Sequence, residues 1–496
     1  MSRVLLIGSA ALILFCAASP SVAAAPAGNP PLIPVGGWMA GVLNQLQNGH
    51  PKEARAALDA HLKNETDPQT RAVAHALRAV ANGMLNDQPA MRIDMAEAIS
   101  LAKDPAPFLV QQIQLGSRTD QGMALEGVAR LAAIDPAKAR ELDEGVIWTL
   151  LQGFREAHRT TENERLVLIL ADLYFGQISS PDEFQKQAAV IMVARGDAQR
   201  ALEYARRVNE RAGLIDILTD RRYQQLWPEL EQSSGVRLEI PARARLARAD
   251  ADFQAHPDSL ALRLNLMRAY VDVGDLQEAD KVGVGFGRTR EELMSLTGTT
   301  AYVVDEHADI LSMLGKAEEA DRRRAALVET WSDSRRWIIS MAINRLAALF
   351  TAHRYEEVLR ELDRPNRRYQ QDSSPYAKQL LRVLRVGSLI GLGRRPEALA
   401  LIPELQAHKA DARAATVDAL MLAGMDDEAE KLVLAALENI EEREVMIQSL
   451  RISDSSPKAD DPLAETIRVR LRARPDVESA FQKYARDLPE TLRRTY

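Results

Sequence analysis

Residues that could carry out chemistry are few and widely spaced in this sequence. No two of the eight histidines stand three to five positions apart, the spacing that places two metal ligands on one face of a helix. The single cysteine, Cys16, lies in an apolar run near the start of the chain. Neither a Gly-x-Ser-x-Gly motif nor a Walker motif is present. We therefore expect no catalytic residues, no metal and no cofactor.

Two short stretches resemble functional motifs but lack their context. Residues 281–288 carry three glycines at alternate positions, whereas a dinucleotide loop needs Gly-x-Gly-x-x-Gly between a strand and a helix. We expect this stretch to be a flexible link between two helical hairpins. Ser455 and Lys458 have a Ser-x-x-Lys spacing, but they stand in a polar stretch without the companion motifs of such enzymes.

Clustered arginines are the strongest local asymmetry of the chain. Between residues 321 and 400, fifteen Arg and one Lys stand against nine acidic residues, although the net charge of the whole chain is -7. One hypothesis is a basic face for an acidic protein, an anionic polysaccharide or lipid headgroups, because Arg makes forked contacts with carboxylate and phosphate groups. The other, more usual for charge runs, is a solvated surface whose arginines pair with neighbouring acids. The candidate basic face comprises Arg335, Arg336, Arg367, Arg368, Arg394 and Arg395.

The charge of the chain as a whole bears on the class of partner. A net charge of -7 is unfavourable for binding a polyanion over a large surface. We therefore expect no nucleic acid partner. The sequence gives no indication of the oligomeric state.

The first residues have the pattern of a secretory signal peptide. Arg3 precedes an apolar run that ends at Phe15, and small residues follow, so we expect cleavage after Ala23 or Ala24 and export to the periplasm or out of the cell. The apolar run is shorter than the ~20 residues that span a bilayer, and no later run is long enough, so we expect no transmembrane segment in the mature chain. The bulky Phe15 before Cys16 argues against a lipid anchor on that cysteine. Residues 24–37, rich in Pro and Gly, predict a flexible lead-in.

The rest of the chain predicts helices in antiparallel pairs. Apolar residues recur at intervals of three and four, and strand patterns are nearly absent. Glycine suits the left-handed backbone that ends a helix, and an alanine one turn into the next helix lets the two helices approach closely. This pattern of a glycine followed five residues later by alanine begins at Gly49, Gly196, Gly274, Gly315, Gly393 and Gly424. His353 and Val358 have the same spacing with both residues replaced.

The spacing of these marks predicts a repeat. From Gly274 onward they lie 31 to 41 residues apart, a period typical of solenoids built from helix pairs. Residues 258–279 resemble a tetratricopeptide repeat, with Tyr270, Gly274 and Ala279 at consensus places. Residues 391–399 and 423–429 resemble the same turn and second helix. The chain departs from the family at Met267, where a small residue is usual, and in its spacing, which exceeds the family's 34 residues.

The resemblance implies both a fold and a mode of binding. It implies an all-α fold, a right-handed solenoid of helix hairpins, that recognises a protein or peptide along a groove lined by the first helix of each pair. Aligned on the turn glycine, the groove positions are Asn265, Arg268, Asp305, Glu306, Asp309 and Asn344. The set of Lys, Arg and Asn with which the family clamps a C-terminal carboxylate is not present at these positions.

These observations predict five segments and one function. The segments are a signal peptide (1–23), the lead-in (24–37), divergent helical repeats (38–230), tetratricopeptide-like repeats (236–452), and a polar loop with terminal helices (453–496). We expect a non-catalytic exported scaffold, in a cell-envelope or polysaccharide-export assembly, because exported members of the family often serve there. The alternative is a glycan-cleaving enzyme built on a helical solenoid or toroid, which would need two facing carboxylates roughly 5 to 10 Å apart.

Overall fold

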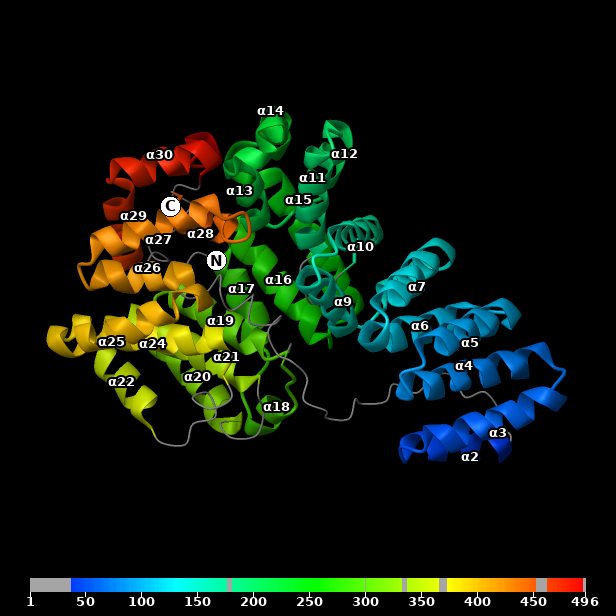
Figure 1. The fold of residues 1–496 in the computed structure, drawn as a ribbon. Coiled ribbons are helices and arrows are strands. Elements are labelled where there is room, and N and C mark those ends of the chain that lie inside the picture. Colours follow the sequence, from blue (N-terminus) through cyan, green and yellow to red (C-terminus); the bar gives the residue numbers. More distant parts are fainter. Residues whose placement is uncertain are drawn as a thin grey trace. The chain divides into compact units, whose positions relative to one another are not determined.

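The computed structural model describes residues 37–175, 181–298, 300–331, 337–364, 373–451 and 462–493. Within these ranges the chain is built from α-helices and short 3₁₀ turns and forms no strand, which confirms the predicted all-α class (Figure 1). None of the helices described is long and apolar enough to cross a membrane. The expected signal peptide, almost all of the lead-in, and Cys16 lie outside the described residues.

The chain divides into two compact units between Ile191 and Met192. The expected boundary between residues 230 and 236 lies within the second unit, where a short helix, Trp227–Ser234, ends and Gly235 follows its last residue. The N-terminal unit contains α2 (Gly37–Gln47), α3 (Pro51–Asn64), α4 (Pro68–Met84), α5 (Gln88–Leu101), α6 (Ala106–Thr119), α7 (Gln121–Ile134), α8 (Pro136–Arg140), α9 (Glu144–Glu156), α10 (Thr160–Leu173) and most of α11 (Pro181–Ala194).

The C-terminal unit contains the remaining helices and 3₁₀ turns. In order they are α12 (Ala198–Ala205), α13 (Arg211–Thr219), η3 (Arg221–Leu226), α14 (Trp227–Ser234), η4 (Val236–Leu238), α15 (Glu239–Ala255), α16 (Leu260–Val273), α17 (Leu276–Val284), α18 (Arg290–Met294), α19 (Tyr302–Met313), α20 (Ala317–Trp331), α21 (Ile338–Thr351), α22 (Tyr355–Asp363), α24 (Pro375–Gly391), α25 (Arg395–Ala407), η5 (Lys409–Asp411), α26 (Arg413–Leu422), α27 (Asp426–Glu438), α28 (Arg443–Leu450), α29 (Pro462–Arg472), α30 (Pro475–Tyr484) and η6 (Glu490–Leu492).

A recurring turn joins the helices of a hairpin. At Gly274, which has φ 86°, the amide donates to the Val271 carbonyl at 3.0 Å, and the next amide, of Asp275, donates to the Tyr270 carbonyl at 2.9 Å. This pair of bonds is the Schellman motif, which satisfies the last carbonyls of a helix. The same two bonds occur at all six glycines named above, whose φ values lie between 72° and 86°. The alanine five residues later is buried in every case.

The same turn also forms without glycine. Asn86, His158 and His353 have φ values of 58°, 53° and 58°, and each is followed by the same pair of backbone bonds. Two of these turns lie in the segment where the glycine pattern is absent from the sequence. Left-handed backbone is less favourable for a residue with a Cβ, so packing between the paired helices must compensate. Helix hairpins therefore continue through the N-terminal unit.

The glycine-rich stretch 281–288 forms the end of α17 and the turn that follows it, and two of its glycines are closely packed, while the expected flexibility stays a prediction. Gly283 lies inside α17, and a Cβ there would be 2.4 Å from Cδ2 of His307. A Cβ on Gly287, which has φ 72°, would be 2.8 Å from Val304. These glycines are needed because α17 and the turn after it lie directly against α19.

The C-terminal unit returns on itself. The helices α28 and α30, near its end, contact α13 and η3, near its start (Figure 1). The Arg486 amide donates to the Thr219 carbonyl at 2.8 Å, and Asp220 and Ala485 form an isolated antiparallel bridge. Residues more than 260 positions apart therefore join the two ends of this unit.

Candidate functional site

The predicted groove positions meet on consecutive first helices of the C-terminal unit. Nε of Arg268, on α16, donates to Glu306, on α19, at 2.8 Å. The amide nitrogen of Asn344, on α21, donates to Asp305, on α19, at 2.7 Å. Asn265 lies on α16 one turn before Arg268. We call the six predicted positions the first-helix row.

A residue that the sequence analysis did not select lies at the centre of this row. Arg324, on α20, is buried; its Nε donates to Asp305 at 2.8 Å and its Nη2 to Asp309 at 2.6 Å. Burial alone lowers the pKa of Arg324, but the carboxylates of Asp309 and Asp305 raise it overall. Burial raises the pKa of Asp305, and the positive charge of Arg324 opposes that rise. The row is therefore a buried network in which one guanidinium serves two carboxylates.

The burial of the row limits what it can offer to a partner. The side chains of Arg268 and Glu306 are 15% and 13% exposed, whereas that of Asp309 is 27% exposed. Asp309 is therefore the most exposed carboxylate of the row. Burial, together with the charge of Asp305, raises the pKa of the nearby Tyr302 to about 12.

Similar pairs connect other neighbouring helices. Arg245, on α15, contacts Glu210 at 3.0 Å and also pairs with Asp272, on α16. Asp321, on α20, accepts from Arg345, on α21, at 2.9 Å, and from Arg354, which precedes α22, at 2.8 Å. The described charges in this part of the unit thus hold successive helices together.

The arginines of the candidate basic face are only partly described. Arg335, Arg336, Arg367 and Arg368 lie outside the described residues, and for them the basic face stays a prediction. Arg394 pairs with Glu397 at 2.6 Å, and Arg395 donates to the Ala423 carbonyl at 2.5 Å. Other arginines between residues 321 and 400 also have acidic partners: Arg382 with Glu404, Arg385 with Asp363, Arg360 with Glu357, and Arg364 with Glu361. The described part of the segment therefore favours arginines paired with acids.

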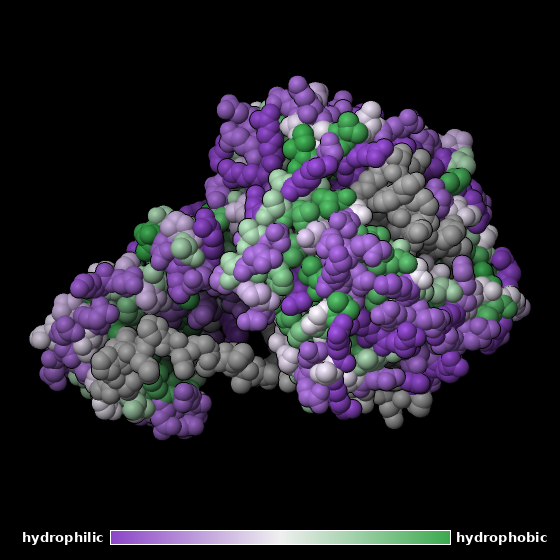
Figure 2. All heavy atoms as spheres, turned by 180° about the vertical axis from the view of Figure 1, so that it is seen from behind, coloured by the Kyte–Doolittle hydropathy of each residue, from purple (hydrophilic) through white to green (hydrophobic). Residues whose placement is uncertain are grey.

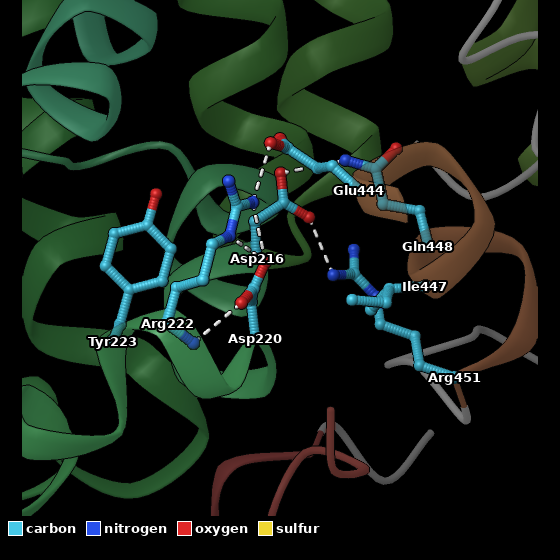
Figure 3. Close-up of a pocket in the computed structure, with 8 residues that line it drawn as sticks. All are labelled: Asp216, Asp220, Arg222, Tyr223, Glu444, Ile447, Gln448 and Arg451. Carbon is cyan, nitrogen blue, oxygen red and sulfur yellow. Dashed lines mark hydrogen bonds and ion pairs between the residues drawn. The ribbon is translucent and has the colours of Figure 1, made fainter. Parts of the chain in front are cut away.

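A small pocket lies where α28 meets α13 and η3. Its cavity volume is about 10 Å³, far below the range of about 300–1,000 Å³ usual for ligand pockets. Figure 3 shows the side chains that line it: Asp216, Asp220, Arg222, Tyr223, Glu444, Ile447, Gln448 and Arg451.

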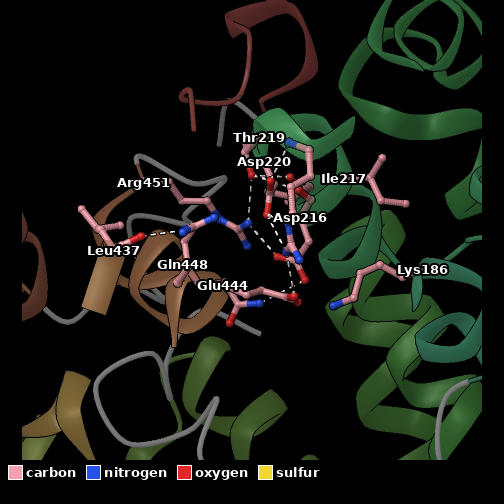
Figure 4. A network of polar contacts seen from close by, with 12 residues as sticks. Lys186, Asp216, Ile217, Thr219, Asp220, Leu437, Glu444, Gln448 and Arg451 are labelled. Carbon is pink, nitrogen blue, oxygen red and sulfur yellow. Dashed lines mark hydrogen bonds and ion pairs between the residues drawn. The ribbon is translucent and has the colours of Figure 1, made fainter. Parts of the chain in front are cut away.

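Arginines neutralise the carboxylates of this pocket. Arg451 contacts Asp216 at 2.6 Å, and Arg222 contacts Asp220 at 2.6 Å and Glu444 at 3.1 Å. Figure 4 shows the same network with Thr219 and Gln448, which contact Arg451 and Asp216 respectively at 3.1 Å. These ion pairs connect the two ends of the unit. Each carboxylate that lines the pocket is paired with an arginine, so the pocket does not present the two facing carboxylates that glycan cleavage would need.

Neither the hydropathy of the surface nor the arrangement of possible metal ligands identifies a further site among the described residues. On the face shown in Figure 2, hydrophilic residues cover most of the surface, and hydrophobic side chains form several patches among them. Among the described residues, no group of three or more His, Cys, Asp or Glu side chains is placed to hold a metal ion.

No protein-family model matches the chain, and no curated protein matches it.

Proposed function

We propose that the chain is an exported, non-catalytic scaffold similar to tetratricopeptide proteins, and that it binds a protein or peptide along the first-helix row. The observation that carries this proposal is the contact between predicted groove positions on α16, α19 and α21. Positions spaced about forty residues apart meet only if the first helices of consecutive hairpins lie side by side.

The recurring turn supports a solenoid as the underlying architecture. The same backbone bonds and the same buried small residue follow the first helix of hairpin after hairpin. Stacked helix pairs of this kind present an extended surface made by their first helices. We propose a right-handed arrangement of these hairpins, as in the family that the sequence resembles.

The proposed partner is a protein or peptide that meets the row at its accessible edge. The three carboxylates of the row, Asp305, Glu306 and Asp309, outnumber the guanidinium groups that pair with them, which are Arg268 of the row and Arg324 of α20. A basic or hydrogen-bond-donating segment is therefore the complementary ligand.

Crosslinking with mass spectrometry tests which helices of the chain contact the partner. The full chain is captured with its partner from the native envelope, and crosslinks are mapped onto the helices. The proposal expects crosslinks on α16, α19, α21 and α24; crosslinks confined to α17, α20, α22 and α25 would contradict it.

A matched pair of charge variants tests the same surface quantitatively. Asp309→Asn removes the accessible charge of the row, and the control Glu318→Gln removes an exposed charge from the first turn of α20. We expect weaker capture of the crosslinked partner with Asp309→Asn only. Glycan hydrolysis by the purified chain, lost in a carboxylate variant, would instead support the enzymatic alternative.

Export is tested on the N-terminus. Mass spectrometry of the mature chain should show that it begins at Ala24 or Ala25, as expected for cleavage of the signal peptide. An intact N-terminus, or a lipidated Cys16, would contradict the proposed route. Periplasmic or secreted localisation and membership of an envelope or polysaccharide-export assembly belong to the same proposal.

A further inference from the structure

The last described segment of the chain packs against α13 and α14, which lie near the start of the C-terminal unit. After α30 ends at Tyr484, residues 485–493 continue with extended backbone at Ala485, which has φ -146° and ψ 178°. Ala485, Leu488 and Leu492 are buried, with exposed fractions of 0%, 0% and 3%. We call residues 485–493 the tail.

Main-chain groups of the tail are paired with this surface. The Arg486 amide donates to the Thr219 carbonyl at 2.8 Å, next to the bridge between Asp220 and Ala485. At the other end, Nη2 of the buried Arg211 donates to the Leu492 carbonyl at 3.1 Å. The tail is therefore bound through its backbone at both ends.

The Arg486 side chain is the anchor between these ends. Its Nε donates to the Leu218 carbonyl at 2.8 Å, and its guanidinium lies 3.6 Å from the centre of the Trp227 ring and pairs with Glu231. The Trp227 indole is fixed in turn, because its Nε1 donates to the Ile217 carbonyl at 2.8 Å. We call the surface formed by Arg211, Leu218, Thr219, Trp227 and Glu231 the seat.

Each of these contacts is of a kind that proteins use to bind peptides. Backbone pairing holds an extended segment, and pockets for particular side chains select its sequence. A guanidinium over an indole adds a cation–π contact, and the carboxylate adds charge. The buried Arg211 donates to the Arg237 carbonyl, outside the tail, and also to the Leu492 carbonyl, so it ties the tail to the body of the unit.

We propose that the seat is a peptide-binding site for an extended segment with arginine followed two residues later by leucine, and that the tail occupies it in cis. The occupant is Arg486-Asp487-Leu488 of the same chain, and it helps to close the C-terminal unit. A partner protein that presents the same pattern competes with the tail for the seat. This proposal is independent of the first-helix row, because the two surfaces share no residue.

Occupation in cis determines the design of the test. A tethered ligand has a high effective concentration, on the order of millimolar for a short link. A free peptide therefore competes poorly with the wild-type tail, and the tail must first be weakened. Arg486→Ala removes the anchor, and Arg493→Ala is the matched control, because among the described residues Arg493 donates within the tail, with its Nε to the Leu488 carbonyl at 2.6 Å.

The first experiment is hydrogen exchange of the tail amides in the full chain. Amides bound to the seat exchange only when the tail detaches. We expect exchange in residues 485–493 to be about tenfold faster or more in Arg486→Ala than in the wild type, as for a loss of about 1.4 kcal/mol, with little change in Arg493→Ala. Equal exchange in both variants would overturn the role of Arg486 as anchor.

The second experiment is binding of a labelled peptide with the sequence of residues 485–493 to the same full chains. We expect the peptide to bind the Arg486→Ala chain at least about tenfold more tightly than the wild type, whose seat is occupied. A peptide with alanine in place of Arg486, or a chain that also carries Glu231→Gln, should bind less. No binding to the Arg486→Ala chain, or equal binding to wild type and variant, would overturn the proposal.

A folding control keeps these results interpretable. Far-ultraviolet circular dichroism and thermal unfolding are recorded for every variant. Glu231→Gln is preferred to a substitution of Trp227 because the Glu231 side chain is 34% exposed, whereas Trp227 is buried. Loss of peptide binding in a folded Glu231→Gln chain then reports on recognition by the seat.

Discussion

Substitution of Gly283 by alanine tests the packing of α17 against α19. A Cβ at this position would lie 2.4 Å from Cδ2 and 2.6 Å from Cγ of His307, and 2.8 Å from the Met267 sulfur. The His307 imidazole is 1% exposed, and its Nε2 lies 2.7 Å from Oδ1 of Asp280. The ring cannot retreat from the new methyl group without disturbing this hydrogen bond.

The expected destabilisation is the sum of three terms. Overpacking costs about 1–3 kcal/mol, and loss of the hydrogen bond to Asp280 about 1 kcal/mol. Alanine in place of glycine inside a helix gains about 1 kcal/mol. The free energy of unfolding should therefore fall by about 1–3 kcal/mol in Gly283→Ala.

A double-mutant cycle with His307→Ala is the assay. When the imidazole is absent, the Met267 side chain can move into the space it leaves, and Gly283→Ala should be neutral or should stabilise by up to about 1 kcal/mol through helix propensity. The free energy is measured by urea unfolding of the four chains. An equal effect of Gly283→Ala in both backgrounds, or a gain in stability in the wild type, would refute the proposed contact.

Three further predictions concern the buried residues of the same unit. Ala279→Leu and Ala398→Leu should each destabilise by about 1–3 kcal/mol, since both alanines are fully buried between paired helices, and unchanged melting temperatures would show that these contacts are misassigned. Arg324→Met should destabilise by about 3 kcal/mol because Asp305 loses its guanidinium, and the double variant with Asp305→Asn should recover part of the loss. Burial lowers the pKa of His307 below the value of about 6.5 in the unfolded chain, so stability should fall as the pH drops below about 6.5, more steeply than in His307→Gln; equal pH profiles would be inconsistent with this.

Local signals in the sequence predicted the helices and most of their turns. Gly274 and Gly315 could be assigned because a left-handed residue at a helix end strongly favours glycine. His353 was recognised by its spacing alone. Asn86 and His158 were missed, although they adopt the same backbone, because nothing in their residue type separates them from the many Asn and His that lie elsewhere.

The first-helix row was predictable in part for a geometric reason. Alignment on the turn glycine fixes the rotation of each first helix, so positions on the same face of different hairpins can be selected without knowing their contacts. Arg324 could not be selected in this way, since it lies on α20, the second helix of its hairpin, and donates from there to Asp305 and Asp309 on α19. The contact of the tail with the seat has no local signal at all, because Arg486 and Thr219 lie more than 260 positions apart.

Charge counted along the sequence is a weak guide to the charge of a surface in such a fold. The excess of arginine between residues 321 and 400 is partly cancelled by acids from the preceding or following helix, as Arg324 by Asp305 and Arg382 by Glu404. Arg323 donates instead to the carbonyls of Gly283 and Phe286 at the end of α17. Because a helix in a hairpin array has neighbours about 20 and 40 positions away, some of these acids, such as Asp305 and Glu404, lie outside the window of eighty residues and are not counted in it. Arg367 and Arg368 lie outside the described residues, and they remain the pair of the candidate basic face on which reversal to glutamate would test it.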